Sequence, residues 1–433
     1  MVYKLNRYLY ISPKKDVVVI YNLLSDVIFA ITREKYLSLI DDNLSELKEK
    51  KTTFFSAMEK LGVILPADVN EIDQIKMRNR QAVFSNQEYR LTINPTLECN
   101  FNCWYCYETH QKGKMQQNTM EAIVNHIKLK INDKSLRRLN LDWFGGEPLL
   151  YFDEILYPLS KQIKDILDEK GIPFVNSATT NGYLIDEERI EKFKEISLSH
   201  FQITLDGSPE MHNKIRFDKN KEGSFKTIIG NINLLADNPE NNVAVRINYT
   251  KQTLLNVNEI IHQFSDRAKN NIVVLFQQVW QDSLKQNISA ENNKKEFEKH
   301  GIRVRNHELN KKYYVCYADL EHQVVINHDG KIYKCTARDF NDENFCGELL
   351  PSGEIQWNTS AMAKRMGHST FENEFCLKCN LLPVCMGLCS QKMVELPPTY
   401  DEKLFRRMCL QGGVKEIIEQ NIENYYNKLT QKN

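Results

Sequence analysis

The first 98 residues of this 433-residue chain lack cysteine, and all eleven cysteines lie at position 99 or later. Net charge is also lacking, because 57 basic residues balance 57 acidic ones, so no overall field draws the chain to nucleic acid or a membrane surface. The N-terminus has no basic stretch followed by an apolar segment, and no apolar run is long enough to span a bilayer. These absences predict a cytoplasmic protein with neither nucleic acid nor membrane as partner.

The cysteines form two groups, three between residues 99 and 106 and eight between residues 316 and 409. A reducing cytosol disfavours disulfides, so cysteines gathered this closely favour metal or redox chemistry. None of the ten histidines is spaced like a metal ligand. The chemistry of the chain is therefore expected at its thiols.

Short β-rich segments alternate with segments of helical periodicity in the middle of the chain. Six strands are expected, at residues 89–94, 139–144, 174–180, 200–205, 243–248 and 271–276. Such alternation predicts right-handed βαβ units and a parallel sheet. Six units are fewer than the eight that close a complete barrel, so the predicted fold class is α/β with an open, partial (β/α)6 barrel of the TIM type.

The unusual segments of this region each follow or end a predicted strand. Barrel enzymes assemble their sites from loops at the C-terminal ends of the strands, so one pocket is expected to collect these segments. Taken alone, the glycine-rich ones would be ordinary turns. In chain order the segments are 99–106, 145–148, 179–182, 205–207 and 246–250.

Cys99, Cys103 and Cys106 form a set of three thiols with no fourth cysteine nearby. Structural zinc takes four ligands, commonly from two cysteine pairs, and no second pair lies near this set. A four-iron cluster held by three cysteines leaves one iron open to an external ligand. An incomplete zinc knuckle or a buried group of thiols is the alternative, and the Gly-Gly-Glu segment one strand later argues against both.

The spacing Cys99-x3-Cys103-x2-Cys106, with Tyr105 before the last cysteine, resembles the signature of radical SAM enzymes. The resemblance implies a [4Fe-4S] cluster whose open iron binds S-adenosylmethionine (SAM), which is cleaved to a 5′-deoxyadenosyl radical that takes a hydrogen atom from substrate. It implies no particular catalytic acid or base, and Arg216 and Arg246 fit structural ion pairs as well as substrate contacts. The implied cofactor-binding residues are Gly145, Gly146 and Glu147 at the SAM ammonium, Tyr105 and Tyr107 beside adenine, Thr180 and Asn181 at the ribose or carboxylate, and Thr204, Asp206 and Asn248 at later strand ends.

Seven cysteines of the C-terminal group match the spacing of the SPASM extension of radical SAM enzymes. That resemblance implies two auxiliary iron–sulfur clusters of the [4Fe-4S] type, one bound by Cys316, Cys335 and Cys389, the other by Cys376, Cys379, Cys385 and Cys409. Residues 323–335 predict a β-hairpin that turns at Asp329-Gly330.

Two alternatives stay open in this region. Cys346 lies outside the seven-cysteine pattern, and it either completes the first auxiliary cluster or is a buried free thiol. A zinc site is the other alternative, with ligands Cys376, Cys379, Cys385 and Cys389.

Residues 1–80 are expected to form a separate small domain. A hairpin turning near residues 22–26 is followed by short helices, the last of which ends at Gly62, and a polar link over residues 68–86 leads to the barrel. This layout resembles the RiPP recognition element, a winged-helix module that binds the leader of a ribosomally made precursor peptide as an added strand, here beside an edge strand within residues 17–31. A domain that only caps the barrel is the alternative.

The sequence thus predicts a winged-helix-like domain over residues 1–80, a radical SAM partial barrel over 87–290 and a cysteine-rich SPASM domain over 310–433. The expected function is oxidative modification of a precursor peptide with a leader sequence, most naturally a thioether or other crosslink. A low-potential electron donor of the flavodoxin or ferredoxin type is the second expected partner. A sulfatase-maturing enzyme that generates formylglycine and a non-catalytic iron–sulfur or zinc scaffold are the alternatives.

Overall fold

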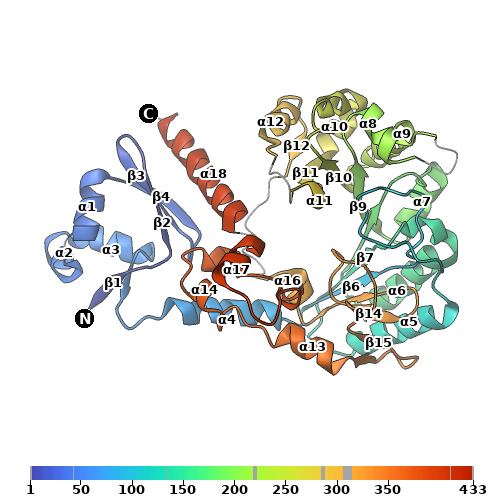
Figure 1. The fold of residues 1–433 in the computed structure, drawn as a ribbon, viewed down its shortest axis with the longest axis horizontal. Helices are drawn as coiled ribbons and strands as arrows, with labels where there is room; N and C mark the ends of the chain where they lie inside the picture. Colours follow the sequence, from blue (N-terminus) through green and yellow to red (C-terminus); the bar gives the residue numbers. More distant parts are fainter. Residues whose placement is uncertain are drawn as a thin grey trace. The chain divides into compact units, whose positions relative to one another are not determined.

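The computed structural model describes residues 2–41, 43–133, 135–217, 222–283, 288–305, 315–409 and 411–431. The chain divides into two compact units (Figure 1). The barrel unit consists of Asn86–Asn306 and His322–Met362, and the terminal unit consists of Met1–Ser85, His307–Glu321 and Ala363–Asn433. The terminal unit therefore combines the two ends of the chain.

One mixed sheet runs through the barrel unit in the order β12-β11-β10-β9-β8-β7-β6-β13-β14-β15-β16. The strands from β12 to β13 are parallel to their neighbours, and the last three pair antiparallel. The strands are β6 (Glu88–Ile93), β7 (Arg138–Trp143), β8 (Phe174–Thr180), β9 (Leu198–Leu205), β10 (Asn242–Tyr249), β11 (Ile272–Gln278), β12 (Arg303–Val304), β13 (Gln323–Ile326), β14 (Lys331–Tyr333), β15 (Gly347–Leu349) and β16 (Ile355–Trp357).

The six predicted strands are confirmed as β6 to β11, in the expected order. Leu91 of β6 lies opposite Leu141 of β7, and Val245 of β10 lies opposite Val274 of β11, all four fully buried. Because β12 and β13 stand at opposite ends of the parallel part, the barrel is open, as six units predict.

Helices and short helical turns connect these strands. Helix α7 begins where the Asp186 side chain accepts from the Arg189 N–H at 2.8 Å, and α6 ends at Gly171, whose φ is 63°. The helical elements are α5 (Gln117–Ile131), η1 (Pro148–Tyr151), η2 (Phe152–Leu156), α6 (Tyr157–Lys170), α7 (Glu187–Glu195), α8 (Pro209–Ile215), α9 (Phe225–Ala236), η3 (Val257–Gln263), α10 (Asp266–Asn271), α11 (Trp280–Ser283), α12 (Glu291–Lys299) and α13 (Thr359–Met366).

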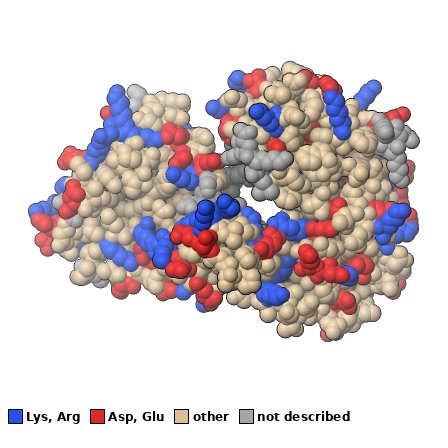
Figure 2. All heavy atoms as spheres, in the orientation of Figure 1, with Lys and Arg blue, Asp and Glu red and all other residues tan. Residues whose placement is uncertain are grey.

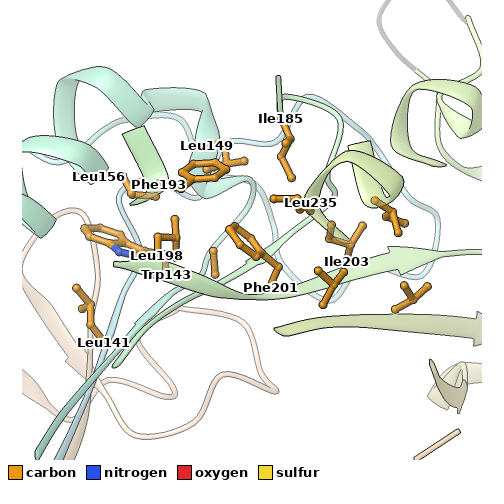
Figure 3. Packing of buried hydrophobic residues seen from close by; sticks show 14 of the residues in the cluster. Leu141, Trp143, Leu149, Leu156, Ile185, Phe193, Leu198, Phe201, Ile203 and Leu235 are labelled. Atoms are coloured by element: carbon orange, nitrogen blue, oxygen red, sulfur yellow. The ribbon is translucent and has the colours of Figure 1, made fainter. Parts of the chain in front are cut away.

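Apolar side chains from strands and helices form the core of the barrel unit, part of which is drawn in Figure 3. Phe193 of α7 packs on Phe201 of β9 with ring centroids 5.3 Å apart. Trp143 is fully buried, and its indole N–H is satisfied by Asn176 Oδ1 at 3.1 Å. Truncating side chains of this kind to alanine typically costs about 3–5 kcal/mol of stability. The packed core therefore fixes the positions of the strand ends.

The predicted hairpin is confirmed, since β13 and β14 pair antiparallel and Gly330 has a φ of 82°. It also extends the barrel sheet, because β13 pairs in parallel with β6. The loop spans residues 327–330, and Asp329 Oδ1 accepts from the Lys331 N–H at 3.1 Å. Cys335 and Cys346 consequently belong to the barrel unit, and the other cysteines of the C-terminal group belong to the terminal unit.

The N-terminal part of the terminal unit contains a three-stranded antiparallel sheet in the order β2-β3-β4. The predicted hairpin is β3–β4, and the predicted helices end before Gly62, whose φ is 66°. The elements are β1 (Tyr3–Leu5), β2 (Leu9–Pro13), β3 (Val17–Asn22), β4 (Val27–Thr32), α1 (Arg33–Asp41), α2 (Leu44–Lys50), α3 (Thr52–Lys60), β5 (Ile64–Pro66) and α4 (Glu71–Val83).

Residues 68–86, expected as a polar link to the barrel, mostly form helix α4, a helix that the sequence did not predict. Asn70 caps this helix through its side chain, and the helix buries Ile75 while its remaining surface is largely polar. The polar composition of this segment therefore did not indicate that it forms a helix with a narrow apolar face.

The C-terminal part of the terminal unit shares a core with the N-terminal strands. Tyr8, Val19 and Tyr21 belong to the same buried cluster as Phe405 and Ile418. Residues 1–85 therefore do not pack as an isolated domain. The C-terminal elements are η4 (Tyr317–Asp319), α14 (Glu374–Leu377), α15 (Leu382–Cys385), α16 (Ser390–Val394), α17 (Glu402–Met408) and α18 (Gln411–Thr430).

On the face drawn in Figure 2, Lys and Arg side chains are interspersed with Asp and Glu. This agrees with the balanced charge of the sequence. Across the residues described, no helix is long and apolar enough to cross a membrane.

Candidate functional site

The loop after β6 carries the first three thiols and is pinned at both ends. Thr96 is buried and donates its hydroxyl hydrogen to the Gly113 carbonyl at 2.6 Å, while the buried Phe101 packs into the barrel core. A turn closed by the Cys106 N–H on the Cys103 carbonyl at 3.0 Å sets the spacing of the last two thiols. We call residues 97–110 the thiol loop.

Burial keeps the thiols of this loop protonated when no metal is bound. It raises the pKa of Cys99 to about 12 and that of Cys106 to about 11, and it also raises the pKa of Cys103. Thiolates are the form that binds metal, so metal binding here would release protons. Among the residues that the structure describes, no three His, Cys, Asp or Glu side chains are arranged to hold a single metal ion.

The predicted Gly145-Gly146-Glu147 segment packs directly on the chain that enters the thiol loop. The Glu147 N–H donates to the Glu98 carbonyl at 2.8 Å, and Gly145 has a φ of 99°. A Cβ atom on Gly146 would lie 2.2 Å from the Glu98 carbonyl oxygen and 2.4 Å from that of Leu97. Glycine is therefore required here because two backbones meet.

The Glu147 carboxylate joins the loops that follow β7 and β8. It is fully buried, and it accepts from the Thr180 hydroxyl at 2.7 Å, the Asn181 N–H at 2.7 Å and the Leu149 N–H at 3.0 Å. Burial raises its pKa, and these hydrogen bonds act in the opposite direction. Most of the accepting capacity of Glu147 is thus used by the protein, and its expected contact with the SAM ammonium stays a prediction.

Asn181 connects the same assembly to the thiol loop. Its side-chain amide donates to Asn100 Oδ1 at 2.7 Å and lies 3.9 Å from Cys99 Sγ. The structure therefore brings together three of the predicted segments, those that follow β6, β7 and β8.

Tyr105 connects the thiol loop to the later strands. Its hydroxyl donates to Asp206 Oδ1 at 2.6 Å and accepts from Arg216 at 2.8 Å and from the Asn248 amide at 3.1 Å. Asp206 and Arg216 are nearly buried and form an ion pair with each other. Arg216 is thus a structural ion-pair residue, one of the two roles expected for it.

Tyr107 points its hydroxyl elsewhere, donating to the Thr336 carbonyl at 2.5 Å. The Thr109 N–H donates to Asp339 at 3.1 Å, so the end of the thiol loop lies against the segment that follows Cys335. Thr204 of β9 lies opposite Arg246 of β10 in the sheet and is nearly buried.

Several neighbours of the thiols were not singled out from the sequence. His110 Nε2 lies 3.3 Å from Cys106 Sγ, and its position four residues after that cysteine could have indicated it. Gln281, after β11, donates to the Tyr105 carbonyl at 2.7 Å, a contact that no local pattern predicts. Glu108 has a buried carboxylate oxygen with no hydrogen-bond partner in the described structure, and burial, with the Asp339 charge, raises its pKa to about 8.

Six thiols of the terminal unit separate into two sets. Cys385 is hydrogen-bonded to Cys409, and Cys376 interacts electrostatically with both Cys409 and Cys379. Cys389 is hydrogen-bonded instead to Cys316, outside this set.

The two sets contain the residues that the SPASM resemblance assigns to different clusters, whereas the zinc alternative has Cys389 in place of Cys409; both assignments stay predictions. The hydrogen bond with Cys316 lowers the pKa of Cys389 to about 6 and raises that of Cys316. The metal that either set binds stays a prediction.

The remaining two cysteines lie in the barrel unit. Cys335 Sγ accepts from the Ala337 N–H at 3.3 Å. Cys346 is fully buried, and its N–H donates to the Ile332 carbonyl at 2.8 Å in the sheet. Burial fits the expectation of a free thiol, and ligation of a cluster by Cys346 stays open.

Comparison with known proteins agrees with the resemblance of the thiol loop to radical SAM enzymes. Residues 93–280 match the Radical SAM superfamily. The chain is 30% identical over 172 residues to a cysteine-type anaerobic sulfatase-maturating enzyme of Clostridium novyi (strain NT), a match that covers 38% of this chain and 42% of the relative. The matched part is thus less than half of that relative.

Two solved structures share the fold. The structure titled "Native anSMEcpe with bound AdoMet and Cp18Cys peptide" aligns with a TM-score of 0.58 and 18% identity, over 79% of this chain and 99% of that chain. Streptococcus suis SuiB bound to precursor peptide SuiA aligns with a TM-score of 0.53 and 15% identity, over 93% of this chain and 99% of that chain.

The matched residues begin at Ile93, the end of β6, and continue to Trp280, just after β11. They therefore include the thiol loop and all six predicted strand ends. Residues 93–280, which match the Radical SAM superfamily, are the radical SAM domain of this chain.

Proposed function

We propose that this chain oxidatively modifies a ribosomally made precursor peptide by radical SAM chemistry. The observation that carries the proposal is the thiol loop, in which Cys99, Cys103 and Cys106 are held against the Gly-Gly-Glu segment through Glu98 and Asn181. The superfamily implies a [4Fe-4S] cluster with SAM, and once bound these supply a 5′-deoxyadenosyl radical that takes a hydrogen atom from substrate.

The side chains of the site would bind the cluster and orient the loops around it. The three thiolates hold the cluster and leave one iron without a protein ligand. Glu147 fixes the loops after β7 and β8 relative to each other, and Tyr105 ties the thiol loop to Asp206. Glu147 and Asp206 are buried, whereas Cys106 at the end of the thiol set is exposed.

The N-terminal sheet is an argument for a peptide as the substrate. SuiB was solved with a precursor peptide, and an alignment over 93% of this chain cannot be reached without most of residues 1–85. Strand β4 is the edge of the β2-β3-β4 sheet within the predicted range 17–31. A leader peptide added beside β4 would gain main-chain hydrogen bonds.

The C-terminal thiols would hold the auxiliary clusters. Cys376, Cys379, Cys385 and Cys409 form one donor set, and Cys316 with Cys389 forms part of the other, to which Cys335 is assigned. All-cysteine sets fit iron–sulfur clusters by their chemistry. There they would supply redox centres for a net two-electron oxidation, which gives a thioether or other crosslink, with a flavodoxin or ferredoxin as electron donor.

The experiment is anaerobic reconstitution of the full chain, followed by incubation with SAM and dithionite. Release of 5′-deoxyadenosine is expected, and Cys103→Ala should abolish it, whereas Lys112→Ala at an exposed position after the loop should not. The peptide encoded beside the gene should lose a pair of hydrogen atoms per crosslink, measured by mass spectrometry. Zinc in place of iron, with no SAM cleavage, would instead indicate a scaffold.

Peptide binding can be tested without disturbing the protein. Deleting residues 1–80 would expose the core that they share with α17 and α18. We therefore expect N-methylation of alternate backbone amides in the leader to weaken binding, while methylation shifted by one residue does not, because the two amide rows of a strand face opposite ways. Equal effects of both patterns would contradict strand addition.

Sulfatase maturation is the second candidate, favoured by the curated relative from Clostridium novyi. A sulfatase-derived peptide with cysteine or serine at the modified position would then be converted to formylglycine, which hydrazide labelling detects. Conversion of that peptide with no reaction of the neighbouring precursor would favour this candidate.

A further inference from the structure

A buried tyrosine hydroxyl in the terminal unit has no hydrogen-bond partner in the described structure. Tyr8 is fully buried just before β2, and its hydroxyl oxygen is among the buried atoms left unpaired. Leaving such a buried donor unsatisfied is destabilising, because the group has lost its hydrogen bonds to water. An acceptor that binds from outside the polypeptide would remove that cost.

Tyr8 lies beside the thiols of the second predicted auxiliary cluster. It shares one core cluster with Cys376 and Cys379. The neighbouring Arg7 donates to the Leu377 carbonyl at 2.6 Å, inside the Cys376-x2-Cys379 turn. A negative charge on Cys379 also acts on the Tyr8 hydroxyl. Residues 7 and 8 therefore adjoin the turn that carries two thiols.

The sulfur of Cys379 already attracts another donor. Arg406 of α17 hydrogen-bonds to it, in addition to its contacts with Glu402. Cluster sulfurs accept hydrogen bonds, and these bonds help to set the reduction potential of the cluster. A hydrogen-bond donor stabilises the extra negative charge of the reduced state, so it raises that potential.

We propose that the Tyr8 hydroxyl donates a hydrogen bond to an inorganic sulfide of an iron–sulfur cluster bound by Cys376, Cys379, Cys385 and Cys409, and so raises its reduction potential. This inference rests on the proposed function, which assigns a cluster to these thiols. Tyr8 also belongs to the N-terminal sheet, because its carbonyl accepts from the Leu23 N–H at 3.0 Å at the end of β3. The N-terminal sheet thus contributes to the surroundings of a redox centre.

The test uses full-length chains in which this cluster is alone. Replacing the thiols of the other two sets and that of Cys346 by alanine leaves the four cysteines named above. Tyr8→Phe in this background should shift the midpoint potential to more negative values in an EPR-monitored titration. The exchangeable proton coupled to the reduced cluster, seen by pulsed EPR after exchange into D₂O, should also disappear. The background substitutions are Cys99→Ala, Cys103→Ala, Cys106→Ala, Cys316→Ala, Cys335→Ala, Cys346→Ala and Cys389→Ala.

Tyr21→Phe is the matched control. Tyr21 is buried in the same core, but its hydroxyl donates to Asp26 at 2.8 Å. Its removal should leave both the potential and the exchangeable proton unchanged. Repeating the two Phe variants in the otherwise unaltered chain keeps the test independent of the alanine substitutions.

Iron analysis separates the two ways in which the proposal could fail. About four irons per chain are expected in the alanine background. Absence of iron would overturn the cluster assignment and, with it, the acceptor of Tyr8. Iron at this level, with a Tyr8→Phe potential and proton coupling equal to those of the background, would overturn the hydrogen bond alone.

Discussion

The hydroxyl of Thr180 donates a 2.7 Å hydrogen bond to Oε1 of Glu147, and both residues are buried. This bond joins the end of β8 to the loop after β7. Through the Glu147 N–H the same residue is bonded to Glu98 at the start of the thiol loop. Glu147 therefore acts as a positioning residue for three strand ends, whatever it contacts in SAM.

Glu147→Gln should destabilise the barrel unit by about 2 kcal/mol, because hydrogen bonds to a charged acceptor are lost or weakened. An amide can accept through only one of its two ends, so either the Leu149 N–H or the Asn181 N–H loses its acceptor. Urea unfolding followed by tryptophan fluorescence measures the change, since Trp143 is buried in β7.

Glu154→Gln is the control for this substitution. Glu154 is exposed in its ion pair with Lys114, so its loss should cost less than about 1 kcal/mol. Equal effects of the two substitutions would contradict the role given to Glu147.

Gly146→Ala should displace the thiol loop. Its Cβ atom would lie 2.2 Å from the Glu98 carbonyl oxygen, a distance that only a backbone shift can relieve. We expect lower iron incorporation and a fall in 5′-deoxyadenosine release of at least about tenfold, equivalent to about 1.4 kcal/mol.

Gly230→Ala provides the comparison, since nothing lies within 4 Å of the added atom in α9. Alanine is favoured over glycine inside a helix by about 1 kcal/mol. This variant should therefore be slightly more stable and fully active, and a matching loss of iron would indicate that crowding at Gly146 is not the cause.

Asp206→Asn should strongly destabilise the barrel unit, because it leaves the buried Arg216 guanidinium without a counter-charge. Breaking a buried ion pair on one side typically costs about 3–5 kcal/mol. Glu210→Gln, only four residues later, breaks an exposed ion pair with Lys214 and should cost less than about 1 kcal/mol. Chemical denaturation of both variants checks the difference, and similar losses would mean that the buried pair contributes little.

Local patterns in the sequence predicted the fold and the thiol loop well. Strands β6 to β11 were visible because each is a short β-rich segment between periodic helices. The loop segments around Gly145 and Asn181 could be placed because parallel strands end at the same edge of a sheet. These features depend on residues that are close together in the chain.

Contacts between distant residues were not predictable in this way. Tyr107 and Thr336 are 229 positions apart, and Arg7 and Leu377 are 370 apart. Neither pair shows a local signal, because each contact depends on the packing of whole elements. The same reason explains why residues 1–80 were expected to form a separate domain, although their strands share a core with α17 and α18.

The stability of the barrel unit should fall in mild acid because of His126. This histidine is 3% exposed, with Nδ1 2.7 Å from the Gly353 carbonyl and Nε2 2.5 Å from the Tyr89 hydroxyl. The carbonyl can only accept, so Nδ1 donates to it, Nε2 accepts from Tyr89 and the ring is neutral. Burial lowers the pKa of His126 from 6.5 to about 4, and the Lys130 charge acts in the same direction.

The unfolded chain therefore binds a proton at His126 before the folded protein does. The contribution of the neutral ring is complete above pH 6.5 and is lost as the pH falls towards 4, with about 2 kcal/mol gone by pH 5. Unfolding free energies at pH 7 and pH 5 measure the loss, and His126→Gln, which cannot titrate, should lose about 2 kcal/mol less than the wild type between them. An identical pH dependence in the two proteins would mean that the folded state accepts a charged ring between Tyr89 and Gly353.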